Sequence, residues 1–342
     1  MAQVTVLIPT FNRRDYLKQA LDSVFAQTFK DFDVLVSDNG SLDGTEELVR
    51  GYLENHPNLQ YHRFPRNMGP AANGLYLLRA PEAEYVAILH DDDYWLPNHL
   101  EDAMGALSGT DNAVLYACAL QKFGMSGDHV MKPMWADSRR RLTVLDPHVD
   151  FPAWLLCTPF VPSATVFKRS ALNSTWALPR NDFTLGDWHL CGQMALQGKT
   201  VFDSKIGAFY RWHATNDSHS CRGKRFAVQF RYTQRTMAYL AFHNGLMTRE
   251  SLVGAVTTQW PMDIAALLVV ALASIDSPAE LRSVAREIVR RRPGLLTDPL
   301  TSGHCRLAGR VGLWYLGWAD IVDRLRGRWW PMRASDRGIE LS

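Results

Sequence analysis

The chain lacks a long apolar run. The longest one spans Ala265 to Ala273, between Asp263 and Asp276, whereas a membrane-spanning helix needs about 20 apolar residues. We therefore expect a buried helix there. The first residues also lack a basic stretch followed by an apolar one, which argues against a secretory signal. The expected location is the cytoplasm.

Cysteine is scarce and net charge is small. The 5 cysteines are an odd number, and no two have the Cys-x-x-Cys spacing, so the pattern indicates neither a disulfide framework nor a zinc knuckle. Lys plus Arg is 37 and Asp plus Glu is 35, which gives a formal net charge of +2. No global field attracts nucleic acid, and we expect no nucleic-acid partner.

Length and composition are those of a globular protein. The 342 residues are 46% hydrophobic and 21% charged, which suits two domains, or one large domain with an appendage. The 11 Trp and 11 Tyr suit either large core side chains, which we favour, or a carbohydrate or lipid-interface site.

Short apolar runs alternate with segments of helical periodicity in the first half of the chain. The predicted strands are 4–9, 32–38, 59–64, 85–90 and 113–118, and helices are predicted between them. This order predicts a parallel, doubly wound α/β sheet with helices on both faces. Such sheets bind ligands beyond the carboxyl ends of their strands.

The second half is less regular. Residues 121–150 are predicted to be a partly irregular excursion, followed by strands at 163–168 and 200–210 with a helix at 188–197 between them. From about residue 224 the pattern is helical. We therefore predict a catalytic domain at 1–220 and a helical region at 221–342.

Polar segments follow four of the predicted strands: PTFN, SDNGSLDGT, RNMGPAAN and HDDDYW. One such segment alone is ordinary turn chemistry, but four at one sheet edge indicate a nucleotide site. The carboxylates of Asp91, Asp92 and Asp93 follow a run that looks buried, where they repel one another and are costly to desolvate. Bound Mg²⁺ or Mn²⁺ would relieve the repulsion and neutralise a diphosphate.

Two other nucleotide motifs are not met. GQMALQGKT has five residues between its glycines, whereas a P-loop has four and follows a strand rather than a helix. No GxGxxG follows the first strand, which argues against a dinucleotide site.

The stretch from Val4 to Thr45 resembles the opening of the family 2 glycosyltransferases, which have the GT-A fold. NMG, HDDDYWLPNHLE and LGDWHLCGQMALQGK follow in that family's order, so the resemblance covers about residues 3–215. It implies a mostly parallel Rossmann-like sheet, a nucleotide-sugar donor, a Mn²⁺ or Mg²⁺ cofactor and transfer with inversion.

The resemblance also implies a set of donor-binding residues. They are Pro9, Thr10, Asn12, Asp38, Asn67, Gly69, Asp91 and Arg211. The first three would hold the base and ribose. Asp38 would accept a hydrogen bond from the imide N–H of the base, and because a carboxylate only accepts, the expected donor is a UDP- or dTDP-sugar.

The family's metal motif is Asp-x-Asp or a variant of it. Counting back from Pro97 puts His90 at the first position and Asp92 at the metal-binding one, with Asp93 as an extra acid. The histidine is a departure, and it leaves open which of Asp91, Asp92 and Asp93 contacts the ion. We favour Asp92.

A later Arg-x-His pattern, Arg211 and His213, matches positions that reach the diphosphate or the metal in similar proteins. We count His213 as a candidate metal ligand, with a purely structural histidine as the alternative.

The family's catalytic base belongs to a Glu-Asp pair at the start of a helix. Here the pair is Gly186–Asp187, so Asp187 matches the base and the Glu is missing. A helix N-cap alone would also explain an Asp. Near a helix N-terminus the carboxylate stays ionised and can take a proton from an acceptor hydroxyl.

Residues 224–342 lie outside the resemblance. Trp, Leu and Val recur at helical spacing in 306–330, accompanied by Arg. Such an amphipathic helix packs on the catalytic domain or a second subunit, or lies on an anionic membrane surface. We favour packing or homodimerisation, while peripheral contact with the inner face of the plasma membrane would fit a lipid-linked acceptor.

The expected reaction is sugar transfer to a hydroxyl of a glycan, a lipid-linked molecule or a small molecule, as in polysaccharide assembly. A nucleotidyltransferase is the second candidate, although it would have a Gly-rich basic loop where this chain has PTFNRR. A non-catalytic carbohydrate-binding protein on a degenerate fold is the third, favoured by the departures at His90 and Gly186.

Overall fold

A computed structural model describes the chain in several ranges, with Gly245 and Arg290 as isolated residues. The ranges are 2–80, 82–125, 128–131, 140–147, 161–173 and 186–214. The chain divides into two compact units, Met1–Thr248 and Arg249–Ser342. The predicted boundary at residue 220 and the predicted amphipathic helix at 306–330 lie outside the described residues. Within the described ranges, no helix is long and apolar enough to span a membrane.

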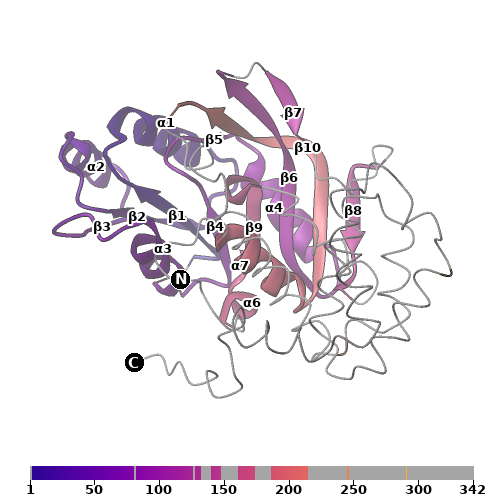
Figure 1. The fold of residues 1–342 in the computed structure, drawn as a ribbon. Helices are drawn as coiled ribbons and strands as arrows, with labels where there is room; N and C mark the ends of the chain where they lie inside the picture. Colours follow the sequence, from indigo (N-terminus) through magenta and orange to yellow (C-terminus); the bar gives the residue numbers. More distant parts are fainter. Residues whose placement is uncertain are drawn as a thin grey trace, which may run out of the picture. The chain divides into compact units, whose positions relative to one another are not determined.

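The first unit begins with strictly alternating strands and helices (Figure 1). These elements are β1 (Val4–Thr10), α1 (Arg14–Phe25), β2 (Phe32–Asp38), α2 (Thr45–Leu53), β3 (Leu59–Arg63), α3 (Pro70–Arg79) and β4 (Tyr85–Ile88). The helical spacing predicted for α1 is confirmed, because Leu17, Leu21 and Val24 are buried on one face of it.

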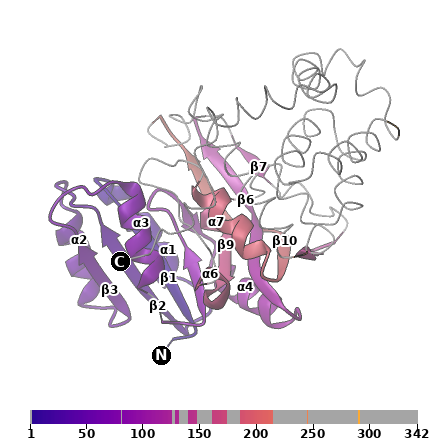
Figure 2. The ribbon, with the colours of Figure 1, turned by 60° about the horizontal axis from the view of Figure 1, so that its bottom comes forward.

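The elements after β4 are more varied. They are β5 (Tyr94–Trp95), α4 (His99–Ser108), β6 (Ala113–Gly124), β7 (His129–Met131), β8 (Leu142–Leu145), the 3₁₀ helix η1 (Pro162–Ala164), β9 (Thr165–Lys168), α6 (Arg169–Asn173), α7 (Gly186–Ala195) and β10 (Lys199–Trp212). Helix α6 contacts β9 and α7 contacts β6, as Figure 2 shows.

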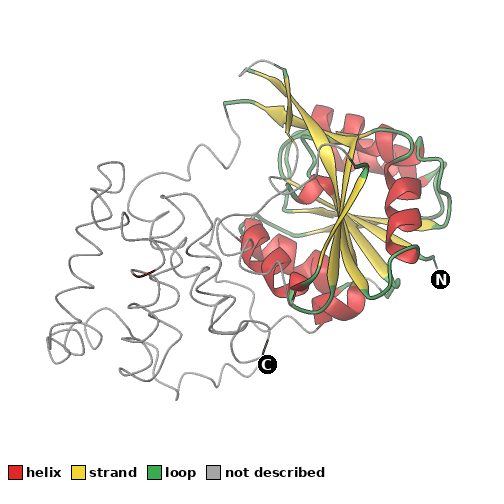
Figure 3. Cartoon of the chain, turned by 90° about the vertical axis from the view of Figure 1, so that its right-hand side faces the viewer, coloured by secondary structure: helices red, strands yellow, loops and turns green. Residues whose placement is uncertain are grey.

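One twisted sheet runs through the unit in the order β3-β2-β1-β4-β9-β6-β10-β5, with β7 beside β6 and β8 beside β10. Strands β3, β2, β1 and β4 are parallel, as are β6 and β10. Helices flank the sheet on both sides (Figure 3). Side chains of β1 and β4 are buried on both faces, which is typical of a parallel sheet between two helical layers.

The structure corrects several local expectations. Strand β9 pairs antiparallel with both β4 and β6, so the sheet is not wholly parallel. The strand predicted at 113–118 continues to Gly124, and the excursion predicted at 121–150 contains β7 and β8. Strand β6 is longer than predicted because it pairs with β10 along its length. The sequence of β6 alone does not reveal this partner strand.

The N-cap residue of α2 makes no side-chain cap hydrogen bond. The residue before the helix is Gly44, whose φ of 85° lies in the left-handed region that glycine tolerates. Asp43 instead accepts hydrogen bonds from the backbone N–H and the hydroxyl of Thr45.

Candidate active site

The carboxyl ends of β1, β2 and β4 meet at one edge of the sheet. In the parallel register Thr10 lies beside Asp38, and Leu7 lies beside Ile88. The loops that follow these strands are therefore neighbours, as the sequence pattern predicted. This ligand edge, as we call it, brings together the loops that carry most of the predicted donor-binding residues.

Asn12 joins the first loop to the second. Its backbone N–H donates to the Ser41 hydroxyl at 2.8 Å, and its side-chain oxygen accepts from the Leu42 N–H at 2.9 Å. Its φ of 51° is left-handed, a conformation that asparagine adopts more readily than most residues. Asn12 thus fixes the shape of the ligand edge.

Asp38 is completely buried and already has partners on both oxygens. Oδ1 accepts from the Ser41 N–H at 2.8 Å, and Oδ2 accepts from the Tyr61 hydroxyl at 2.7 Å with Arg63 Nε at 3.5 Å. Burial and the Asp38 charge raise the pKa of Tyr61, which keeps its hydroxyl a donor. For Asp38 to read a base N–H, one of these partners has to give way, and that role stays a prediction.

Side-chain amides hold the loop between β3 and α3. Asn67 Oδ1 accepts from Asn39 Nδ2 at 2.9 Å and from the Gly69 N–H at 2.8 Å. Gly69 has a φ of 89°, a backbone conformation that residues with a side chain rarely adopt. Two large apolar side chains on these loops are exposed, Phe11 at 38% and Met68 at 41%, and the sequence analysis did not single them out.

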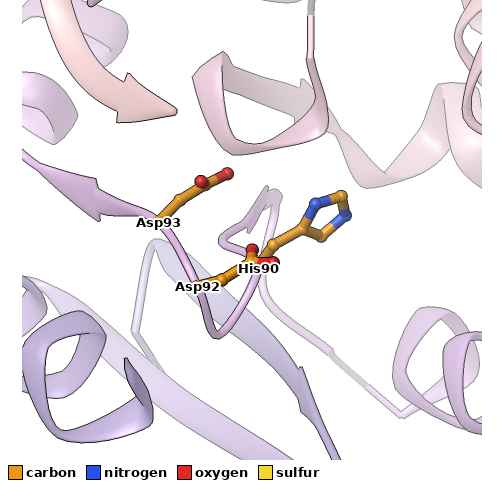
Figure 4. A group of neighbouring side chains, drawn as sticks. All are labelled: His90, Asp92 and Asp93. Atoms are coloured by element: carbon orange, nitrogen blue, oxygen red, sulfur yellow. The ribbon is translucent and has the colours of Figure 1, made fainter. Parts of the chain in front are cut away.

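The acid triplet Asp91, Asp92 and Asp93 follows β4 and is buried. His90 joins it, because ligand atoms of His90, Asp92 and Asp93 all lie within 4.8 Å of one another (Figure 4). Carboxylate oxygens suit Mn²⁺ and Mg²⁺, and an imidazole nitrogen is a common metal ligand. The histidine that departs from the family motif therefore lies where it could serve as a metal ligand.

Asp93 is tied to two distant segments. Its Oδ2 accepts from the Ser163 hydroxyl at 2.5 Å, and its Oδ1 accepts from the Arg211 N–H at 2.9 Å. Ser163 also accepts from the His90 N–H at 3.1 Å. These bonds anchor the turn after β4 to η1 and to β10, and Ser163 was missed by the sequence analysis because nothing in its surroundings marks it.

Three basic side chains contact Asp92. Its Oδ2 lies 2.8 Å from Arg13 Nη1 and 3.0 Å from His213 Nε2, and its carbonyl accepts from Arg211 Nε at 2.9 Å. Arg13 Nη1 also reaches Asp91 Oδ1 at 3.0 Å. The structure thus brings Arg211 and His213 to the acid triplet, and it adds Arg13, which the sequence analysis did not name.

Burial raises the pKa of two members of the triplet, Asp91 and Asp93. It raises the pKa of Asp91 to about 6, although the Arg13 charge acts in the opposite direction. Burial and the neighbouring Asp92 charge raise the pKa of Asp93 to about 7. Buried carboxyl groups that resist ionisation in the protein alone are stabilised as carboxylates by a bound cation. The residues present therefore fit a divalent metal ion.

Asp187 lies in the first turn of α7, which is described from Gly186. A carboxylate in the first turn interacts favourably with the helix dipole, so a purely structural role stays the alternative. The side chain of Asp187 is partly buried. Its role as a base stays a prediction.

Residues 5–176 match the sequence profile of glycosyl transferase family 2, which is half of the chain. The chain belongs to this family. Over 172 residues it is 28% identical to an uncharacterised glycosyltransferase of Rickettsia typhi, a match that covers 49% of this chain and 52% of the relative.

A second relative has a named activity. Over 125 residues the chain is 31% identical to the GalNAc(5)-diNAcBac-PP-undecaprenol β-1,3-glucosyltransferase of Campylobacter jejuni, covering 36% of this chain and 40% of the relative. The chain thus spans about half the length, or less, of these curated relatives.

Solved structures share the fold. TarS of S. aureus (residues 1–349, with UDP-GlcNAc) superposes with a TM-score of 0.63 at 16% identity, over 86% of this chain and 90% of that one. The mannosyltransferase PcManGT of Pyrobaculum calidifontis, with GDP-Man and Mn²⁺, gives 0.53 at 20% identity, over 92% and 87%. The predicted GT-A fold and family resemblance are confirmed.

Proposed function

We propose that the chain is an inverting glycosyltransferase that moves a sugar from a UDP- or dTDP-sugar to an acceptor hydroxyl. The observation that carries the proposal is the cluster of partly buried His90 with buried Asp92 and Asp93 at the ligand edge of a family 2 fold. Nucleotide-sugar binding is supported by TarS, solved with UDP-GlcNAc.

The donor would lie across the loops of β1, β2 and α3. Pro9, Thr10 and Asn12 would line the base and ribose, and Asn67 with Gly69 would approach the nucleoside from the other side. The exposed side chains of Phe11 and Met68 would cover the base, because burying apolar and aromatic surface stabilises binding. Asp91, at the end of β4, would face the ribose or the sugar.

His90, Asp92, Asp93 and His213 are the residues that would hold Mn²⁺ or Mg²⁺. A bound divalent cation would neutralise the diphosphate and stabilise the leaving nucleotide. Arg211 donates to the carbonyl of Asp92 and to Gln19, which fixes its guanidinium beside the cluster. A fixed cation at that place favours the charge that develops on the departing phosphate.

Asp187 would take the proton from the attacking acceptor hydroxyl. The chemistry of the acceptor is a glycan, a small molecule or a lipid-linked sugar, and the undecaprenol-linked acceptor named for the Campylobacter jejuni relative favours the last. Transfer with inversion needs a single displacement, for which one base is enough.

Asp187→Asn tests the base. We expect transfer to fall about 10²–10⁴-fold, while the affinity for the nucleotide-sugar stays within about twofold, because the amide keeps the size of the carboxylate but cannot accept the proton. Sugar transfer and isothermal titration with the donor measure the two effects. Asp15→Asn, at an exposed residue of α1, is the matched control. Normal transfer by Asp187→Asn would exclude the residue as the base.

The reaction class is tested by incubating the protein with nucleotide-sugars, Mn²⁺ and a panel of acceptors. Release of UDP or dTDP together with a glycosylated product supports the proposal. Release of pyrophosphate would indicate a nucleotidyltransferase, and donor binding without turnover across the panel would indicate a non-catalytic carbohydrate-binding protein.

A further inference from the structure

Arg13 occupies a distinctive place among the charges of the ligand edge. Its Nη1 lies 3.0 Å from Asp91 Oδ1 and 2.8 Å from Asp92 Oδ2, so one guanidinium nitrogen bridges two buried carboxylates. The backbone of Arg13 immediately precedes α1 and follows Asn12. Arg13 therefore reaches the acid triplet from the first loop, which belongs to the proposed donor site.

The bridge uses a carboxylate that the metal also needs. Asp92 is a member of the cluster whose ligand atoms lie within 4.8 Å of one another, and its Oδ2 already accepts from Arg13 and contacts His213. A guanidinium and a divalent cation repel each other, and they compete for the same negative charge. It is therefore unfavourable for the Arg13 guanidinium and a divalent cation to bind Asp92 at the same time.

Arg13 is also the partner that can leave. Asp93 is held by Ser163 and by the backbone of Arg211, contacts that a cation does not oppose. The Arg13 side chain is 26% exposed, so it reaches solvent at the ligand edge. A diphosphate arriving there would offer the guanidinium a new anionic partner with the two-pronged geometry that arginine favours.

We propose that Arg13 is an exchangeable counter-ion: it holds Asp91 and Asp92 while the donor site is empty, and it moves from Asp92 to the diphosphate when the donor and its divalent cation bind. This inference rests on the proposed function. Its consequence is that Mn²⁺ alone binds weakly, and that nucleotide and metal strengthen each other's binding by the same factor.

The test measures Mn²⁺ binding to the whole protein by electron paramagnetic resonance, with and without UDP. In Arg13→Met, which keeps the stem but removes the charge, we expect Mn²⁺ alone to bind about tenfold more tightly than in the unaltered protein, and the enhancement by UDP to shrink by about the same factor. Arg14→Met is the matched control, because Arg14 pairs with the exposed Asp15, and it should change neither quantity.

Thermal unfolding shows whether the Arg13 variants are folded. Without metal, Arg13→Met should melt at a lower temperature than the unaltered protein, because the buried carboxylates of Asp91 and Asp92 lose a counter-ion, and Mn²⁺ should raise its melting temperature by more. Arg13→Lys keeps the charge but not the planar fork, so its Mn²⁺ affinity should lie between the other two.

The outcomes separate the two proposals. If the unaltered protein binds Mn²⁺ and UDP together but Arg13→Met binds Mn²⁺ alone no more tightly, the exchange is wrong and the proposed function stands. If Arg13→Met does not fold, an unchanged Mn²⁺ affinity in Arg13→Lys overturns the exchange. If the unaltered protein binds no Mn²⁺ even with UDP, the metal-dependent donor site fails, and the role of Arg13 fails with it.

Discussion

The acid triplet and the ion-pair cluster around Asp203 differ in how their charges balance. In the triplet, the Arg13 guanidinium pairs with Asp91 and Asp92. His213 also contacts Asp92, and the backbone N–H of Arg211 donates to Asp93. Burial raises the pKa of Asp91 and of Asp93 to about 6 and 7. Two of the three carboxyl groups therefore resist ionisation in the protein alone.

The second cluster is matched in charge. Arg141 reaches Asp203 at 3.1 Å and Asp102 at 2.5 Å, and Lys205 reaches Asp102 at 2.5 Å. Two carboxylates thus face two cations, and the Tyr116 hydroxyl lies 3.4 Å from Asp203. Its bonds join α4, β6 and β10 to the residue that precedes β8.

The difference suggests different roles: the cluster around Asp203 stabilises the fold, whereas the acid triplet is the proposed ligand site. A balanced cluster is complete and needs nothing from solution. Three adjacent buried carboxyl groups are costly for the protein alone, and the divalent cation of the proposed function would offset this cost. The comparison leads to three tests.

Asp92→Asn should have the largest effect, and on activity rather than stability. We expect sugar transfer to fall by about 10²-fold or more, because a lost metal ligand removes several kcal/mol of charge stabilisation. The free energy of unfolding without metal should hold or rise, because one repelling charge is gone. Transfer assays and urea unfolding measure the pair. A large loss of stability with normal transfer would make the triplet a structural cluster.

Asp203→Asn should show the reverse pattern. We expect the free energy of unfolding to fall by about 1–3 kcal/mol, less than for a fully buried pair because the Arg141 side chain is 56% exposed. Mn²⁺ affinity should not change. Lys205→Met is the control, since an exposed ion pair contributes about 0.5 kcal/mol or less. Weakened Mn²⁺ binding in Asp203→Asn would show that the two clusters are coupled.

The pKa of His99 tests how weakly the charges of the cluster around Asp203 act on a neighbouring buried side chain. Burial lowers the pKa of His99 to about 3, and the charge of Asp102 opposes this only in part. Because the unfolded chain binds a proton near pH 6.5 and the folded one does not, stability is full above pH 6.5 and is lost as pH falls towards 3. The slope approaches about 1.4 kcal/mol per pH unit.

Urea unfolding between pH 7 and pH 5 measures this slope. In His99→Gln the contribution of the histidine disappears, so the curve should be flatter than that of the unaltered protein. Parallel curves for the two proteins would contradict a buried neutral His99.

Strands β1, β2 and β4 could be predicted because they contain runs of apolar residues that are buried on both faces. VTVLIP and FDVLVSD became β1 and β2 with the expected bounds to within one residue. The antiparallel direction of β9 could not be predicted, since the pattern of a strand of four residues, Thr165–Lys168, does not encode whether it pairs parallel or antiparallel. The extension of β6 to Gly124 depends on its partner β10, which only the folded sheet supplies.

The site shows the same division. The acid triplet was visible because consecutive carboxylates after a buried strand are physically costly, and the family pattern pointed to Arg211 and His213. His90 was read as a departure, because the motif has an acid there. Ser163 was not visible, because its contact with Asp93 crosses 70 positions of the sequence, and no local pattern encodes such a contact.

The bond between Arg211 and Asp93 joins residues 118 positions apart. During synthesis, β1 to β4 can pair while β10 is still untranslated, and at about 5–20 residues per second that interval lasts roughly ten seconds. Over that interval the nascent turn after β4 has no tether to the far strand. The turn that carries the acid triplet is thus completed only together with β10, after the strands beside β1 have had time to pair.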